Sequence, residues 1–280
     1  MLRNRYLWGL SLLIMFSSHI AQAKVELKGS MQQGGLIHGV AAPGSVVKLN
    51  GKELLITKKG QFIFGFGRNA PKNHQLVVTL PNGKTEIRNL KVKQRDYRIQ
   101  RIKGIPKQIM QPSASDISRA RQDTAQIKTA RSKVSKLEGF LEKFQWPAIG
   151  PITGVYGSQR FYNGKPSRPH YGVDVANPTG SPVVAPAAGK VILATEDMFY
   201  SGDTILIDHG YGLNSAFLHM SKITVQRGQM VKAGDKIGEI GATGRVTGPH
   251  LDWRMNWFDQ RIDPQLLVDP MPQIKKEKKK

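Results

Sequence analysis

The 280-residue chain contains no cysteine, and this absence excludes several kinds of protein. Without thiols there is no disulfide-stabilised scaffold, no thiolate metal site and no cysteine nucleophile. Any metal ion must therefore be held by histidine or carboxylate side chains.

Acidic residues are also scarce, because 20 Asp and Glu stand against 42 Lys and Arg, which gives a net charge of +22. Such a balance is typical of proteins with a polyanionic partner, such as nucleic acid, an anionic membrane surface or an acidic envelope polymer. Long apolar runs are nearly absent as well. A mean hydropathy of −0.35 with a single such run excludes a polytopic membrane protein.

The one apolar run lies at the N-terminus and is typical of a secretory signal peptide. Arg3 and Arg5 precede the apolar residues 6–16, and residues 21–23 read Ala-Gln-Ala, the pattern that signal peptidase recognises. An uncleaved anchor is the alternative, but the run is short for a membrane span. We predict that residues 1–23 are removed, that no transmembrane segment remains, and that the protein is exported to the periplasm or cell envelope. Export argues against nucleic acid as the partner.

Residues 24–104 alternate between apolar and polar positions in short stretches separated by turn residues. Strands are expected around 46–49, 62–64 and 76–78, with turns at Asn50-Gly51 and near Asn82-Gly83. This spacing predicts a small accessory β-sandwich of the immunoglobulin-like type.

The basic linker, residues 105–145, is predicted to contain a helix over residues 113–145. That stretch has no proline, and its apolar residues recur at steps of mostly three or four positions. Ser113, Ser115 and Asp116 are candidate N-caps, and Trp146-Pro147 ends the pattern. One interpretation is a solvated spacer between two domains; the other is an electrostatic contact with an anionic polymer.

Residues 146–270 are rich in glycine and proline and contain many short β-type runs. The segments are too short for βαβ crossovers, so a mainly antiparallel second domain is predicted. Residues 271–280 form a Lys-rich tail. The fold class predicted for the whole chain is mainly β.

The second domain also holds the residues that can carry chemistry. His170 and Asp174 lie four positions apart, and His250 and Asp252 share one strand face at i and i+2. His219 is flanked by apolar residues. Each feature alone is weak, because a chance His–Asp pair or a buried core histidine explains it equally well. Together they can supply the three ligands and the general base that a zinc hydrolase needs.

Two other hydrolase classes lack their motifs in this chain. No H-E-x-x-H occurs, so a helix-borne zinc site is excluded. No G-x-S-x-G occurs, which argues against a serine hydrolase.

Residues 146–270 resemble the lysostaphin-type (LytM-like) zinc metallopeptidases, which cut peptidoglycan cross-links. The resemblance rests on the following segments: Gly-Val-Tyr-Gly at 154–157, Arg-Pro-His-Tyr-Gly-Val-Asp-Val-Ala at 168–176, the Gly-Ser-Pro-Val-Val-Ala-Pro run from 180, Asp-His-Gly at 208–210, Phe-Leu-His-Met-Ser at 217–221, and Gly-Ala-Thr-Gly to His-Leu-Asp at 241–252. These segments occur in the family's order over nearly all of the second domain.

The resemblance implies a role for each residue of the site. His170 and Asp174 match two zinc ligands, and His219 and His250 match the two non-ligand histidines that act on the catalytic water and the oxyanion. The third ligand of the family is the second histidine of a His-x-His pair, and this chain has Asp252 there instead. A site with two carboxylate ligands and one zinc ion would carry no net charge. His209 is expected to support the structure.

The function implied is an exported zinc metallopeptidase, carrying one zinc ion, that hydrolyses peptide cross-links of peptidoglycan. The departure at Asp252 raises an alternative, a degenerate LytM-like module that has lost its zinc and activates another wall hydrolase. Other envelope proteins are possible partners. The accessory region and linker, residues 24–145, are expected to restrain or to position the peptidase domain.

The signal peptide leads to a first prediction. If signal peptidase cuts after Ala23, mass spectrometry of the protein recovered from the cell envelope finds Lys24 at its N-terminus. An envelope-located protein that retains Met1 would identify residues 1–23 as an anchor instead.

Overall fold

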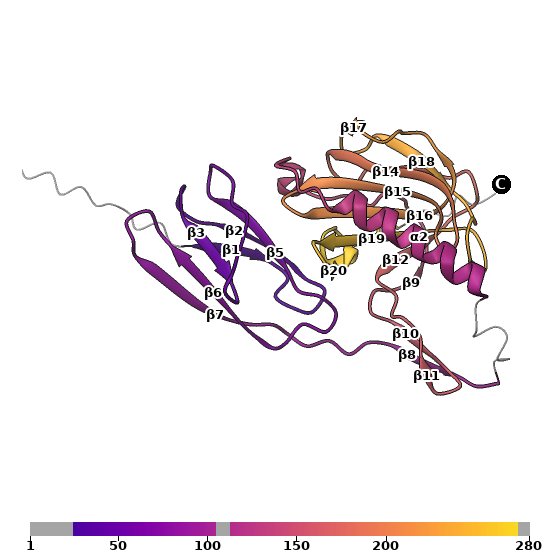
Figure 1. Ribbon diagram of the computed structural model, residues 1–280, viewed down its shortest axis with the longest axis horizontal. Coiled ribbons are helices and arrows are strands. Elements are labelled where there is room, and N and C mark those ends of the chain that lie inside the picture. Colours follow the sequence, from indigo (N-terminus) through magenta and orange to yellow (C-terminus); the bar gives the residue numbers. More distant parts are fainter. Residues whose placement is uncertain (1–24, 105–112, 274–280) are drawn as a thin grey trace, which may run out of the picture.

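The computed structural model describes residues 25–104 and 113–273, which form two β domains joined by a linker that contains one helix (Figure 1). The predicted signal peptide, the start of the predicted linker and most of the Lys-rich tail lie outside the described residues. Within the described ranges, no helix combines the length and the apolar character that a membrane crossing needs.

The accessory domain consists of two small sheets packed around a common core. Phe62 and Phe64 of one sheet, together with Leu76 and Val78 of the other, are almost completely buried. The predicted alternation is seen in β3, where Val47 and Leu49 are buried and Lys48 is exposed, whereas residues 62–64 of β5 are all buried. The sheets have the strand orders β1(Glu26–Gly29)-β2(Leu36–Val40)-β5(Gln61–Gly65) and β4(Lys52–Glu53)-β3(Val46–Leu49)-β6(Asn73–Thr79)-β7(Thr85–Lys91).

The second domain is built on one large antiparallel sheet, as predicted. The order along its main path is β17(Met230–Val231)-β14(Gly189–Met198)-β15(Gly202–Gly210)-β16(Leu213–Ile223)-β19(His250–Trp257)-β12(Gly172–Ala176)-β9(Ile152–Gly154). Strands β13(Pro182–Val184), β18(Lys236–Ile240) and β20(Gln260–Ile262) attach beside this path. Two 3-10 turns, η1(Gly139–Leu141) and η2(Pro264–Leu266), complete the elements of the domain.

The two faces of this sheet have different environments. Val173, Phe217 and Trp253 point into the main core and are fully buried. Leu218, which lies opposite Asp252 in the β16–β19 register, belongs to a separate cluster on the other face. Cross-strand partners share a face, so Asp252 also lies on that second face.

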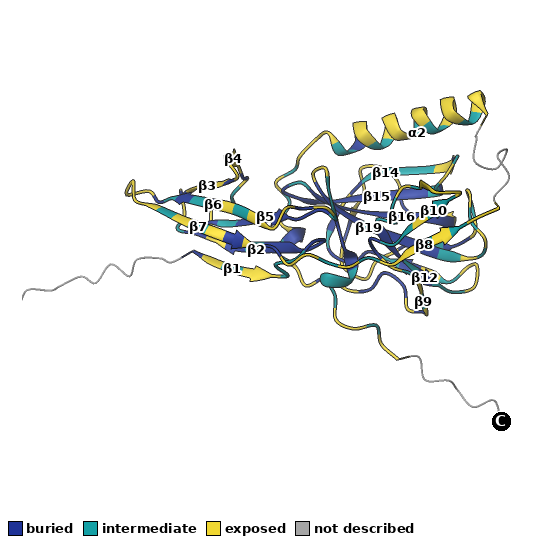
Figure 2. Ribbon diagram, turned by 90° about the horizontal axis from the view of Figure 1, so that it is seen from below, coloured by how far each residue is buried: buried dark blue, intermediate teal, exposed yellow. Residues whose placement is uncertain are grey.

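The helix α2(Ala114–Arg131) covers part of the second face, where Ile127 packs against the cluster that contains Leu218. Ser113 caps its N-terminus as predicted, because the Ser113 hydroxyl accepts from the Asp116 N–H. The outward side of α2 is exposed (Figure 2).

The predicted extension of this helix to residue 145 is wrong, because α2 ends at Arg131. Phe144 follows the predicted helical spacing only by coincidence, since it and Phe140, which lies in the 3-10 turn η1, are buried against the sheet domain beyond the end of α2. A Cβ on Gly139 would overlap the carbonyl oxygen of Ala188. Tertiary packing of these aromatic residues therefore outweighs the local preference for helix.

The end of the accessory region forms β8(Ile99–Ile102), which does not pair with the accessory sheets. It pairs in parallel with β10(Gln159–Tyr162), next to β11(Lys165–Pro166), in the second domain. This is the one parallel strand pair among the strands that the structure describes. The chain thus enters the second domain through a strand that contributes to its surface.

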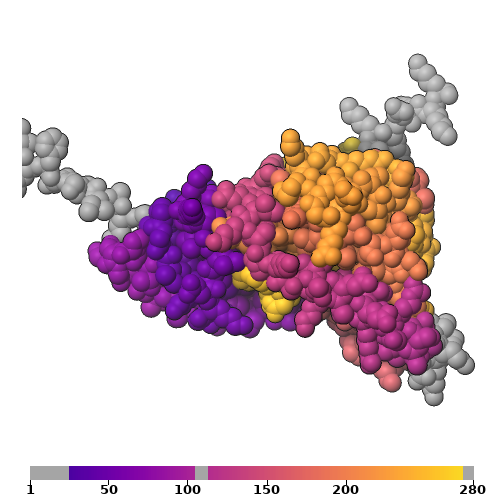
Figure 3. Space-filling model, turned by 45° about the horizontal axis from the view of Figure 1, so that its top comes forward, coloured from indigo at the N-terminus to yellow at the C-terminus, as the bar shows by residue number. Residues whose placement is uncertain are grey.

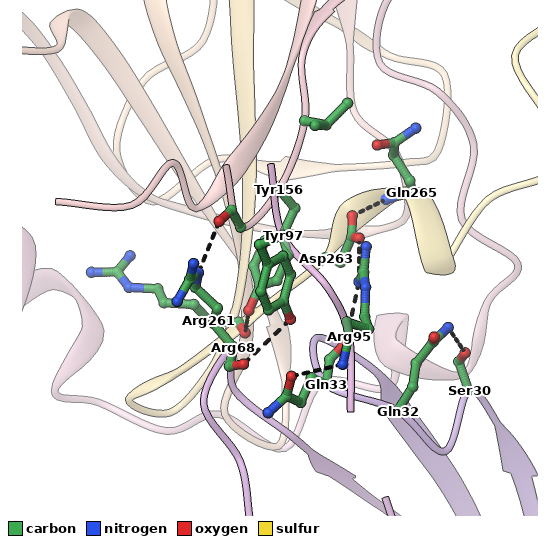
Figure 4. Close-up of polar contacts among 12 residues, drawn as sticks. Ser30, Gln32, Gln33, Arg68, Arg95, Tyr97, Tyr156, Arg261, Asp263 and Gln265 are labelled. Carbon is green, nitrogen blue, oxygen red and sulfur yellow. Dashed lines mark hydrogen bonds and ion pairs between the residues drawn. The ribbon is translucent and has the colours of Figure 1, made fainter. Parts of the chain in front are cut away.

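The two domains are held together by a polar and aromatic interface (Figures 3 and 4). Arg95 donates to the buried carboxylate of Asp263 at 2.8 Å, and the Arg68 guanidinium donates to the carbonyl of Gly157 at 2.9 Å. The Tyr97 ring of the accessory region packs edge-on against Tyr156 of the second domain, whose hydroxyl donates to the carbonyl of Arg261 within that domain. One hydrophobic cluster is continuous across both domains.

The Arg95–Asp263 pair supports a prediction about stability. The Asp263 side chain is 2% exposed, so Arg95→Ala leaves a buried carboxylate without its cation. We expect a loss of about 3 kcal/mol in the free energy of unfolding, measured by urea denaturation.

Lys143→Ala is the matched control, because it breaks the Lys143–Asp269 pair, whose side chains are 76% and 74% exposed. That variant should lose no more than about 1 kcal/mol. Equal losses of unfolding free energy in the two variants would mean that the interdomain pair stabilises the protein no more than an exposed ion pair does.

Candidate metal centre

The second face of the large sheet brings the predicted site residues together. In the β12–β19 register, Asp174 lies directly opposite Asp252, and Ala176 lies opposite His250. His170 stands just before β12, and His219 comes from β16 on the other side of β19. Three neighbouring strands therefore position all five residues.

His170, Asp174 and Asp252 form a cluster that can hold a metal ion. Each offers one ligand atom, and these atoms lie within 4.8 Å of one another. The Nε2 of His170 is 3.1 Å from Oδ1 of Asp174, and both atoms are buried without a hydrogen-bond partner of normal geometry. Buried polar atoms that face one another in this way need a further partner, and a cation supplies it.

The electrostatics of the cluster also favour a cation. Like charges directly opposite on neighbouring strands are destabilising, and Asp174 and Asp252 are such a pair. Burial disfavours the charged form of His170, but the carboxylate of Asp174, which faces the His170 Nε2, and the charge of Asp252 outweigh it and raise the His170 pKa. The donor set of one imidazole and two carboxylates suits zinc.

Two glycines leave the space that the carboxylates occupy. A Cβ on Gly154, which pairs with Asp174 from β9, would overlap the Asp174 carboxylate. A Cβ on Gly172 would overlap Oδ1 of Asp252. Both carboxylate positions thus depend on the absence of a side chain on the neighbouring strand.

His219 and His250 lie beside the cluster in matching hydrogen-bond arrangements. The Nδ1 of His219 is 2.9 Å from the carbonyl oxygen of Thr243, and the Nδ1 of His250 is 2.9 Å from that of Gly248. A carbonyl can only accept, so each neutral ring carries its proton on Nδ1 and leaves Nε2 as an acceptor. The Nε2 of His250 is 3.9 Å from Oδ1 of Asp174, and the two ring centroids are 5.0 Å apart.

His219 owes its position to a local irregularity of β16. Its φ of 66° lies in the left-handed region, where the register between β15 and β16 shifts between Phe217 and Met220. Burial lowers the pKa of His219, so its ring is neutral and able to accept a proton near neutral pH. His209, by contrast, is fully buried, with Nδ1 near the carbonyl of Ala188 and Nε2 near the Ser215 hydroxyl. It has the supporting position that was expected.

Arg254 is the residue of this site that the sequence analysis missed. Its Nε donates to both carboxylate oxygens of Asp252 at 3.0 Å, and Nη2 also contacts Oδ2. Burial alone would raise the pKa of Asp252, but the Arg254 guanidinium lowers it to about 2. Asp252 is therefore ionised, and the positive charge of Arg254 offsets one of the two carboxylates. The expected zinc site without net charge did not include Arg254, whose guanidinium adds one positive charge. The i, i+2 spacing of Asp252 and Arg254 on one strand was the available signal.

The cluster lies at the side of a groove of about 500 Å³. His170, Asp174 and Arg254 line it together with Arg98, which precedes β8, and with residues of β9 and β10. None of the groove-lining residues comes from residues 25–97. A second cavity, of about 440 Å³, lies between the accessory domain and Trp257, and none of the five site residues lines it.

Fold and site together define a mainly β protein with a histidine–carboxylate cluster that can hold a metal ion beside an open groove. Residues 168–264 match peptidase family M23. Within the second domain, residues 168–264 are therefore a peptidase M23 domain.

Relatives support this assignment over the same part of the chain. The peptidoglycan DD-endopeptidase ShyB of Vibrio cholerae is 45% identical over 95 residues, which are 34% of this chain and 22% of the relative. ShyA, another peptidoglycan DD-endopeptidase of that organism, is 45% identical over 87 residues, 31% of this chain and 20% of the relative. The match thus spans only about a fifth of either relative.

A solved structure matches both domains. The crystal structure described as a peptidase M23 from Pseudomonas aeruginosa is 29% identical, with a TM-score of 0.66, and the match covers 85% of this chain and 95% of that one. The accessory domain and the peptidase domain therefore occur together in a second protein.

The packing of Gly154 leads to a prediction about metal binding. Gly154→Ala should displace the Asp174 carboxylate and weaken zinc binding at least about tenfold, as measured by chelator competition, while the thermal unfolding curve stays cooperative.

Gly248→Ala is the control, because Gly248 lies near the site but a Cβ there would meet nothing within 4 Å. Unchanged zinc affinity in Gly154→Ala would show that Asp174 does not bind the metal.

Proposed function

We propose that the protein is an exported zinc metalloendopeptidase that hydrolyses peptide cross-links of peptidoglycan. The observation that carries this proposal is the convergence of three ligand atoms from His170, Asp174 and Asp252 within 4.8 Å, beside two histidines with free Nε2 atoms. The M23 match and the two DD-endopeptidase relatives point to the same class of reaction.

In this proposal, His170, Asp174 and Asp252 hold one zinc ion. Zinc bound there supplies a Lewis acid that polarises the scissile carbonyl and makes water a better nucleophile near neutral pH. Arg254 keeps Asp252 ionised and fixes the orientation of its carboxylate through two donors. The open groove beside the cluster leaves room for an extended peptide.

His219 and His250 divide the proton and charge chemistry between them. One imidazole accepts a proton from the attacking water at Nε2 and returns it to the nitrogen of the leaving amine as the amide bond breaks. The other, protonated at Nε2 from solvent, donates a hydrogen bond to the developing oxyanion. The backbone carbonyls of Thr243 and Gly248 hold the rings in the tautomer that this requires. The bond cut is an amide between D-alanine and diaminopimelate in a Gram-negative cell wall, as the names of the DD-endopeptidase relatives support.

The accessory region positions the peptidase domain and does not cover it. Residues 25–97 contribute nothing to the lining of the groove, whereas β8 pairs along its edge. The buried Arg95–Asp263 pair holds the two domains in one arrangement.

The division of roles can be tested by measuring zinc content and hydrolysis of purified sacculi in the same preparations. His219→Ala and His250→Ala should keep stoichiometric zinc and lose about 10² or more in turnover. His170→Ala, Asp174→Ala and Asp252→Ala should lose zinc and activity together.

His74→Ala is the control, because His74 lies in the accessory domain and should change neither quantity. Loss of zinc from His250→Ala would reverse the roles of His250 and Asp252. Purified wild-type protein without zinc binding and without hydrolysis would favour the degenerate activator module, in which the Asp252–Arg254 pair replaces the metal.

A further inference from the structure

The groove beside the metal cluster is strongly positive in its lining. Arg98, Arg160, Arg168 and Arg254 all line it, and Asp174 is the one carboxylate among its lining residues in the described part of the chain. Arg254 is already paired with Asp252. For Arg98, Arg160 and Arg168, the structure contains no ion pair with any described carboxylate.

Two of these arginines lie side by side because of the parallel pairing of β8 with β10. Arg160 lies opposite Gln100 in the register, and its Nε donates to the Gln100 amide oxygen at 3.2 Å. Side chains alternate along a strand, so Arg98 shares the face of Gln100 and of Arg160. The backbone N–H of Gln159 donates to the carbonyl of Arg98, which fixes this register at its first residue.

The segment that carries Arg98 is held firmly at the domain interface. The Arg68 guanidinium lies 4.4 Å from the centre of the Tyr97 ring, and the Tyr97 ring packs edge-on against Tyr156. A Cβ on Gly157 would overlap the Tyr97 ring, so the two chains are in close contact. Arg98 follows directly and is therefore presented by a fixed backbone.

Positive charge also accumulates at the C-terminal end of α2. Arg131, the last residue of α2, has a buried Nε without a hydrogen-bond partner in the described chain. Burial, followed by the charges of Arg261 and Arg254, lowers the Arg131 pKa to about 9. Arg131 therefore adds positive charge in the vicinity of Arg254 and Arg261, although it does not itself line the groove.

We propose that Arg98, Arg160 and Arg168 form a carboxylate-binding wall of the groove, which selects peptides with free carboxylates near the scissile bond. This proposal rests on the proposed function and adds the substrate class to it. Guanidinium groups bind carboxylates through paired hydrogen bonds, and in a groove such pairs give both orientation and discrimination. Arg98 lies outside the M23 match at 168–264, so the accessory region supplies part of the substrate site.

The wall is tested by binding of two synthetic cross-linked stem peptides to the full chain without residues 1–23, in a His219→Ala background that prevents turnover. One peptide has free carboxylates, and the other has the same sequence with those groups amidated. The acidic peptide should bind at least about tenfold more tightly, by isothermal titration calorimetry. Arg98→Gln and Arg160→Gln should each remove much of this difference and leave the affinity for the amidated peptide unchanged.

Arg101→Gln is the matched control. Arg101 lies on β8, three residues after Arg98, but its guanidinium stacks 4.6 Å from the centre of the Phe161 ring and does not line the groove. Arg98→Lys should retain part of the preference, because it keeps the charge but loses the two-pronged geometry. Zinc content and the melting temperature should be equal in all variants.

Three results of the binding measurements would overturn the wall. They are equal affinity for the two peptides, equal losses in Arg98→Gln and Arg101→Gln, and binding of the acidic peptide that inorganic polyphosphate displaces as readily from the Arg98→Gln variant as from the parent. The last result would indicate general attraction to anionic polymers. If the wild-type protein prefers the acidic peptide but cleaves neither peptide, the carboxylate-binding wall is supported and the proposed peptidase activity is rejected. Wild-type protein that cleaves both peptides equally would keep the peptidase and reject the wall.

Discussion

The direct opposition of two carboxylates, Asp174 on β12 and Asp252 on β19, is the constraint on which the site depends. Two negative charges at this distance inside a sheet are unfavourable unless cations neutralise them. Arg254 neutralises one from the same strand as Asp252. The ligand atoms of His170 and Asp174 that remain without partners point to a metal ion for the other.

The backbone around these carboxylates is shaped to accept them. Gly154 and Gly172 stand on the neighbouring positions of the sheet, where any side chain would occupy the space of a carboxylate. The irregularity at His219 turns an imidazole toward the same region. The two glycines and the left-handed backbone of His219 thus occur at one place in the sheet. Such a concentration of open space and backbone strain is typical of a functional site and not of a sheet optimised for stability alone.

The accessory domain is structurally part of the peptidase and not an independent attachment. The buried Arg95–Asp263 pair and a continuous hydrophobic cluster join the two domains, and β8 extends a sheet beside the groove. The linker then returns as α2 to cover the sheet face that carries Asp252. Residues of the accessory region thus line part of the groove, where Arg98, Arg160 and Arg168 contribute to the positive net charge of the chain.

Much of this protein could be predicted from its sequence, because some signals are local. Period-two alternation predicted the strands, Ser113 predicted the start of α2, and the spacings of His170-x3-Asp174 and His250-x-Asp252 placed pairs of polar groups on common faces. The metal-ligating chemistry follows from the residue types themselves, since the chain has no thiols. Tertiary structure decided the rest. It ended α2 at Arg131, because the burial of Phe140 and Phe144 outweighs helical spacing, and it moved β8 to the second domain. It also paired Arg254 with Asp252 and placed Arg98 beside the groove. The first contact lies within one strand but depends on the burial of both side chains, and the second brings together segments that are distant in the sequence.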